Sequence, residues 1–158
     1  MAKEIERKFL VAGDGWRVAI EKSSSIRQFY LAAAPDRTVR VRIRDGAAWL
    51  TLKFGAQARV RDEFEYPIPL TEAEEMRAFA IGTVIEKTRH NVRFGAHVYE
   101  VDVFAGILSG LVLAELETSE DVADAQLPLP HWLGREVTGE SAYYNASLAL
   151  NGKPENSP

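Results

Sequence analysis

Charged and apolar residues alternate over long stretches of this chain, and a period of two predicts β-strands. In residues 38–45, arginines alternate with valine and isoleucine. Alternation of this kind predicts eight strands, at residues 4–10, 25–32, 38–45, 48–54, 59–68, 83–94, 97–104 and 111–117. The first of them places Glu4, Glu6 and Lys8 on one face, a dense group of charges for the start of a globular domain.

Turn and helix signals separate these segments. Asp45-Gly46 is a sequence typical of a two-residue β-hairpin loop. Thr71 and Glu74 form a capping-box pattern, which predicts a helix with Thr71 as its N-cap. The remaining predicted segments are helices at residues 71–79, 118–125 and 141–150 and a flexible tail at residues 151–158.

The composition is that of a folded domain. The 158 residues are 46% hydrophobic and 27% charged, so we expect a single domain over residues 1–150. The net charge of −4 argues against general nucleic-acid binding, and no apolar run is long enough to span a membrane. The chain has no cysteine and its N-terminus is charged, so we expect a cytoplasmic protein without disulfides or thiolate chemistry.

One face of each predicted strand gathers many ionisable side chains. The basic members are Lys8, Arg40, Arg42, Arg44, Lys53, Arg59, Arg61, Lys87 and Arg89. The acidic members are Glu4, Glu6, Glu63, Glu65, Glu100, Asp102, Glu115 and Glu117. A solvated sheet face with cross-strand ion pairs would explain one or two such strands. It does not explain seven, because a surface would also carry many uncharged polar residues.

Eight strands are enough to close into a small barrel. We therefore predict an α+β fold built on a closed antiparallel eight-stranded β-barrel, with a charged interior and a few flanking helices. Such an interior is costly without a ligand, because like charges crowd a space of low dielectric constant. Arginine and lysine bind phosphate oxygens, while carboxylates bind hard divalent cations. Both signs in quantity therefore indicate a polyphosphate bound together with a divalent metal.

Nine short motifs, in order along the chain, carry a family resemblance. The first is Glu4-x-Glu6-x-Lys8, and the others lie at residues 28–31, 41–44, 50–53, 61–65, 86–89, 100–106, 114–117 and 134–138. This ordered set resembles the CYTH superfamily, the triphosphate tunnel metalloenzymes, which include bacterial inorganic triphosphatases, thiamine triphosphatase and class IV adenylyl cyclase. Two positions depart from the pattern usual in relatives, Phe29 and His90.

The resemblance implies a tunnel-shaped barrel that hydrolyses a triphosphate, above all inorganic tripolyphosphate, with Mg²⁺ or Mn²⁺ as cofactor. The implied metal ligands are Glu4, Glu6, Glu63, Asp102, Glu115 and Glu117. The implied phosphate-binding residues are Lys8, Arg42, Arg44, Lys53, Arg61, Lys87 and Arg89. The candidate catalytic residues are Lys8, Lys87 and Tyr30, the last as a proton acceptor.

Other functions stay open from the residues alone. A class IV adenylyl cyclase would need a pocket for adenine, which no segment specifies, and thiamine triphosphatase would use the same phosphate chemistry. A non-catalytic polyphosphate- or nucleotide-binding module belongs to a different class, and binding alone does not require so many carboxylates. The family also allows a homodimer, for which the sequence shows no interface.

Overall fold

Strands form wherever the sequence alternates. The computed structural model describes residues 2–55, 60–118 and 127–155, without the side chains of residues 2–4. The strands are β1 (Ala2–Val11), β2 (Ile20–Ala34), β3 (Arg37–Arg44), β4 (Ala47–Phe54), β5 (Val60–Ile68), β6 (Ile81–Phe94), β7 (His97–Phe104), β8 (Val112–Thr118) and β9 (Leu133–Glu136). The helices are the short 3-10 turns η1 (Gly15–Ala19), η2 (Arg77–Phe79), η3 (Gly106–Leu108) and η5 (Ser141–Tyr143), and α1 (Leu70–Met76) and α2 (Asn145–Asn151).

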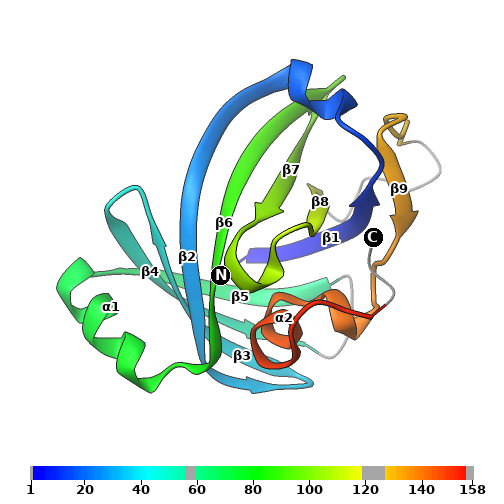
Figure 1. Cartoon of the computed structure of the whole chain (residues 1–158). Coiled ribbons are helices and arrows are strands. Elements are labelled where there is room, and N and C mark those ends of the chain that lie inside the picture. Colours follow the sequence, from blue (N-terminus) through cyan, green and yellow to red (C-terminus); the bar gives the residue numbers. More distant parts are fainter. Residues whose placement is uncertain (1, 56–59, 119–126, 156–158) are drawn as a thin grey trace.

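Eight strands close into one antiparallel barrel, as predicted. Their order is β5-β4-β3-β2-β6-β7-β8-β1, and the ring closes because β1 pairs with β5 as well as with β8. Residues 2–5 of β1 pair with β5, and residues 5–10 pair with β8. The short strand β9, which the sequence did not predict, pairs with the end of β1 outside this ring. In Figure 1, β1 runs from β5 toward β9.

Asp45-Gly46 forms the tight turn between β3 and β4, as predicted. Both residues have positive φ angles, 52° and 81°, and Arg44 pairs directly with Ala47 across the turn. A loop of this kind matches the right-handed twist of the two strands and fixes their register. A slip of one residue would turn Arg40, Arg42 and Arg44 away from the barrel interior.

Apolar side chains cover the outside of the barrel in two clusters. Under α1, Val41 and Ile43 pack with Ala73. Over the strands on the other side, Trp16 of η1 packs in a second cluster with Phe9. The apolar faces of the strands therefore point outward into these cores, and the charged faces point inward.

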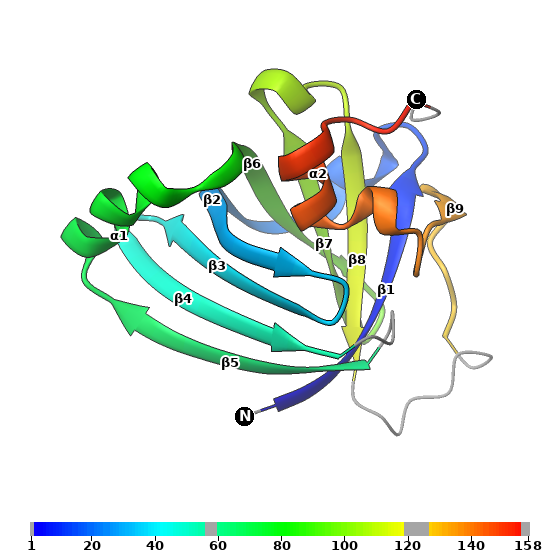
Figure 2. The ribbon, with the colours of Figure 1, turned by 90° about the horizontal axis from the view of Figure 1, so that it is seen from below.

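The C-terminal segment fills one end of the barrel, where the interior changes from charged to apolar. Tyr143, Leu148 and Ala149 pack there against Tyr30 of β2 and Leu113 of β8. Figure 2 shows α2 between β2 and β8. We call residues 137–151 the C-terminal cap.

Two helix predictions were wrong in detail. α1 begins at Leu70 with Pro69 at its N-cap, and Thr71 makes no capping bond, because the extended backbone of Pro69 already sets the start of the helix. The helix predicted at residues 141–150 is split into η5 and α2. Tyr144 interrupts it, with a φ of −68° and a ψ of 140° that no α-helix can contain.

The strand and tail boundaries also differ from the prediction. β2 begins at Ile20, five residues early, because its first residues pair with β6. The predicted tail starts inside α2, whose last residue is Asn151. The helix predicted at residues 118–125 lies outside the described residues, apart from Thr118, which ends β8. None of the helices in the described ranges has the length and apolar character that crossing a bilayer requires.

Gly82 of β6 lies against the backbone of the cap, which leads to a prediction. Its φ is +70°, and a Cβ atom at this position would lie 2.4 Å from the carbonyl oxygen of Ala149. We expect Gly82→Ala to lower the free energy of unfolding by roughly 1–3 kcal/mol, measured by urea denaturation, because backbone strain and a backbone clash act together.

The control for Gly82→Ala is Gly95→Ala. Gly95 also has a positive φ, +60°, but a Cβ atom there would meet nothing within 4 Å. The control therefore carries the backbone strain without the clash and should lose less stability. Equal losses in the two variants would contradict the close packing of α2 on β6.

Candidate active site

The barrel interior holds a cavity of about 1010 Å³. Among the described residues, eight basic and six acidic side chains line it, so its wall is more basic than the chain as a whole, which has a net charge of −4. The predicted site residues that line it are Glu6, Lys8, Tyr30, Arg42, Arg44, Lys53, Arg61, Glu63, Arg89, Glu115 and Glu117. They come from seven strands and meet only because the barrel closes.

Three predicted site residues have other positions. Lys87 and Asp102 are buried and do not line the cavity. The backbone of Glu4 pairs with that of Arg61, and its side chain lies outside the described part of the structure. Period-two alternation predicts which face of a strand a side chain occupies, but it does not predict how deeply the side chain is buried. The roles of these three residues stay predictions.

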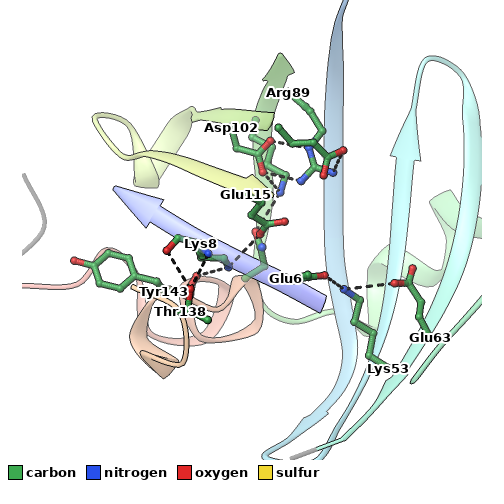
Figure 3. A network of polar contacts seen from close by, with 12 residues as sticks. Glu6, Lys8, Lys53, Glu63, Arg89, Asp102, Glu115, Thr138 and Tyr143 are labelled. Carbon is green, nitrogen blue, oxygen red and sulfur yellow. Dashed lines mark hydrogen bonds and ion pairs between the residues drawn. The ribbon is translucent and has the colours of Figure 1, made fainter. Parts of the chain in front are cut away.

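Asp102 is the centre of a buried polar network (Figure 3). Arg89 donates to it from Nε and Nη2, each 2.8 Å from a carboxylate oxygen, and Nζ of Lys87 lies 2.7 Å from Oδ2. Burial opposes ionisation of this carboxyl, but the two cations outweigh burial and hold the pKa of Asp102 well below its usual range. The network fixes Arg89 along the cavity wall.

The two cations that share Asp102 respond differently to burial. Burial lowers the pKa of Lys87 to about 7, although Asp102 opposes this shift. Burial acts in the same direction on Arg89, but its two bonds to Asp102 prevail and raise its pKa. The difference follows from geometry, because Arg89 engages both carboxylate oxygens whereas Lys87 contacts one.

Two pairs of carboxylates face one another across neighbouring strands. Glu6 on β1 lies opposite Glu117 on β8, and Glu100 on β7 lies opposite Glu115 on β8. Like charges directly opposite destabilise a sheet unless a cation relieves them. Burial and the neighbouring Glu115 raise the pKa of Glu100, against the effect of Arg89. Glu117 has no ion-pair partner among the described residues.

These carboxylates fit a hard divalent cation in their chemistry, because Mg²⁺ and Mn²⁺ prefer oxygen ligands. In the described part of the chain, no three acidic or histidine side chains converge closely enough to hold an ion. Two of the four facing carboxylates are instead paired with lysines: Lys53 lies 3.2 Å from Glu6, and Lys8 lies 3.3 Å from Glu115 (Figure 3).

Three arginines on the cavity wall have no carboxylate partner in the described ranges. Arg42 donates from Nε to Oε1 of Gln28 at 2.9 Å. The Cζ atoms of Arg44 and Arg61 lie 5.0 and 4.8 Å from the centroids of a tryptophan and a tyrosine ring. Burial lowers the pKa of Arg42 to about 9. Guanidinium groups with free donors in a concave site are well suited to phosphate.

Arg40 is a site residue that the family motifs did not identify. It shares the inward face of β3, lines the cavity and is only 7% exposed. Its Nη2 lies 3.3 Å from Oγ1 of Thr51, and its buried Nε has no hydrogen-bond partner in the described structure. The alternation of β3 had already placed it on the charged face, although no family motif assigned it a role.

The two departures from the family pattern lie away from the cavity. Phe29 is buried in the apolar cluster under α1. His90 has its Nδ1 2.6 Å from Oγ of Ser23, and its ring lies 5.2 Å from that of Trp16. Neither residue lines the cavity, so the charged wall is unaffected by them.

Comparison with known proteins agrees with this geometry. The family model of the CYTH domain matches residues 2–149. The chain belongs to the CYTH domain family. This CYTH domain is 40% identical over 152 residues to an inorganic triphosphatase of Acetivibrio thermocellus, covering 96% of each chain. It is also 40% identical over 154 residues to an inorganic triphosphatase of Nitrosomonas europaea, covering 94% of this chain and 97% of that one.

A solved structure shares the same architecture. The CYTH domain is similar to the crystal structure of an inorganic triphosphatase, with a TM-score of 0.68 and 39% sequence identity. The match covers 98% of this chain and 99% of the other. The match therefore includes both the barrel and the C-terminal cap.

Lys87 leads to a prediction on the pH dependence of stability. Its folded pKa of about 7 lies below the ordinary value of 10.5. Between these values the unfolded chain binds a proton that the folded CYTH domain does not bind, so the free energy of unfolding increases with pH. From pH 7 to pH 9 we expect a gain on the order of 1 kcal/mol in urea denaturation, and a smaller gain in Lys87→Met.

The control for this pH dependence is Lys22→Met. Lys22 is an exposed lysine at the far end of β2 from the cap, so its replacement should leave the gain intact. An equal gain in wild type and Lys87→Met would assign the pH dependence to a different group.

Proposed function

We propose that this protein is a divalent-metal-dependent triphosphatase that hydrolyses inorganic tripolyphosphate inside the barrel. The observation that carries the proposal is the composition of the cavity wall, where arginines without carboxylate partners in the described ranges share one space with facing carboxylates. A polyanion and a hard cation together satisfy both groups. The names of the two relatives, each matched over nearly its whole length, support the same reaction.

The arginines and lysines of the wall would bind the phosphates. Arg42, Arg44 and Arg61 present free N–H donors that match phosphate oxygens. Lys53 and Lys8 are held by Glu6 and Glu115 in this structure, and phosphates would replace those carboxylates as their partners. The basic wall would then stabilise the negative charge that develops as the phosphoanhydride bond breaks.

The carboxylates would hold the metal. The residues we assign to it are Glu4, Glu6, Glu63, Asp102, Glu115 and Glu117. When bound, Mg²⁺ or Mn²⁺ supplies charge neutralisation for the phosphates and lowers the pKa of a coordinated water. Asp102 would have to give up part of its contact with Arg89 or Lys87 to take part, so it is the most costly of these residues to recruit.

The proton of the attacking water needs an acceptor. Tyr30 lines the cavity and is 4% exposed, so it stays our candidate for this role. Lys87 does not line the cavity, and its contact with Asp102 suits it to hold Arg89 in place. We therefore assign Lys87 to positioning and leave proton transfer to Tyr30.

A substrate assay tests the proposed function. Purified protein is incubated with tripolyphosphate, ATP or thiamine triphosphate, with Mg²⁺, Mn²⁺ or EDTA, and phosphate and cyclic AMP are measured. We expect phosphate release that requires metal and has its highest kcat/KM with tripolyphosphate, without cyclic AMP. Cyclic AMP from ATP would instead indicate a cyclase, and binding of tripolyphosphate without turnover would indicate a binding module.

Glu117→Gln tests the metal assignment through stability as well as activity. The variant removes one charge of a facing carboxylate pair, so in EDTA it should be as stable as wild type or more stable by up to about 1 kcal/mol. It should also lose most of the rise in melting temperature that Mn²⁺ produces in wild type. Turnover of tripolyphosphate should fall by about 100-fold or more.

Glu86→Gln is the matched control for Glu117→Gln. Glu86 is exposed and does not line the cavity, so its replacement should change neither the Mn²⁺ response nor turnover. If Glu117→Gln destabilised the protein in EDTA and kept its full response to Mn²⁺, Glu117 would be a structural residue rather than a metal ligand.

A further inference from the structure

Tyr144 reaches the cavity from the C-terminal cap and meets two cations of the candidate site. Its ring centroid lies 4.8 Å from Cζ of Arg61 and 5.9 Å from Nζ of Lys8. The cations belong to β5 and β1, the two strands whose pairing closes the barrel, so one ring lies beside a cation from each. Both distances lie within the range in which the face of an aromatic ring attracts a cation.

The backbone of the cap aims this ring into the cavity. Tyr144 has an extended backbone and lies between η5 and α2. Its side chain therefore projects from the cap and is not part of the face of either helix. The residues on both sides are anchored, because the carbonyl of Tyr143 accepts a bond from Nζ of Lys8 at 3.0 Å, and Oδ1 of Asn145 accepts one from Nζ of Lys87 at 3.3 Å. The ring is therefore held at a defined position.

A ring is an unusual partner for Arg61. In the described part of the chain, this arginine has no hydrogen bond and no ion pair, and the ring contact is what locates its guanidinium. A carboxylate at the same place would neutralise the charge and occupy the N–H donors. An aromatic face attracts the cation and leaves both the charge and the donors available to an anion.

We propose that Tyr144 is a positioning residue, whose ring face holds Arg61 and Lys8 ready to receive a phosphate group of the substrate. The inference rests on the proposed function and adds to it a residue from the cap, outside the strands that carry the other site residues. The ring, and not the phenolic hydroxyl, performs this role. Its loss should weaken binding of the phosphate chain and leave the rate of the bound complex little changed.

The test compares two substitutions of Tyr144. Tyr144→Phe keeps the ring and should keep the KM for tripolyphosphate close to that of wild type. Tyr144→Leu keeps most of the bulk without an aromatic face and should raise KM by about 3- to 30-fold, with kcat changed by less than about threefold. Melting temperatures are measured alongside, and Tyr144→Met replaces the leucine variant if leucine lowers the melting temperature.

Tyr66→Leu is the matched control, because Tyr66 is an exposed tyrosine on β5 that does not line the cavity. It should change neither KM nor kcat. An unchanged KM in the stable aliphatic variant would overturn the proposal, and so would a phenylalanine variant as impaired as the aliphatic one.

Calorimetric titration with sodium tripolyphosphate in EDTA separates this inference from the proposed function. If wild type binds tripolyphosphate but does not hydrolyse it with any metal, the triphosphatase proposal fails, and the Kd values of the same variants still test the ring. If wild type binds tripolyphosphate neither in EDTA nor in the presence of Mg²⁺, both proposals fail.

Discussion

β1 pairs with β5 through its first residues and with β8 through the rest, and this double pairing converts an open sheet into a ring. Without it, the inward faces of the strands would be one solvated surface with weak ion pairs. With it, the charged side chains face one another across one enclosed cavity, where attraction and repulsion are stronger than on an open surface. Ring closure therefore gathers the arginines and carboxylates of seven strands around one cavity.

The ion pairs inside the barrel differ in how deeply they are buried. Lys53 and Lys8 relieve Glu6 and Glu115, yet each pair stays partly accessible from the cavity. Arg89 and Asp102 are more deeply buried and are joined by two bonds, so they form the fixed part of the interior. Ion pairs that are accessible from the cavity therefore lie beside a buried network that is held by two bonds.

The sequence predicted the barrel wall because alternation is a local property. An arginine at every second position of β3 is sufficient to assign its two faces, and Asp45-Gly46 is sufficient to join it to β4. β9 and the position of Tyr144 depend on distant contacts. β9 has only four residues, one of them Gly134, and forms because β1 offers it a free edge. Tyr144 sits between two short helices, where the sequence predicted one helix over residues 141–150.

One edge of β1 is divided between two partners, and this division bears on the order of folding. β5 occupies the edge at residues 2–5 and β9 at Phe9 and Val11, and between them the backbone of Lys8 bonds to Val137 and Thr138. The chain passes at this point from the outside of the barrel to the inside. The chain thus enters the barrel between β5 and β9. Its C-terminal end does not have to pass through a ring that has already closed. The C-terminal cap can therefore dock after the eight strands have closed.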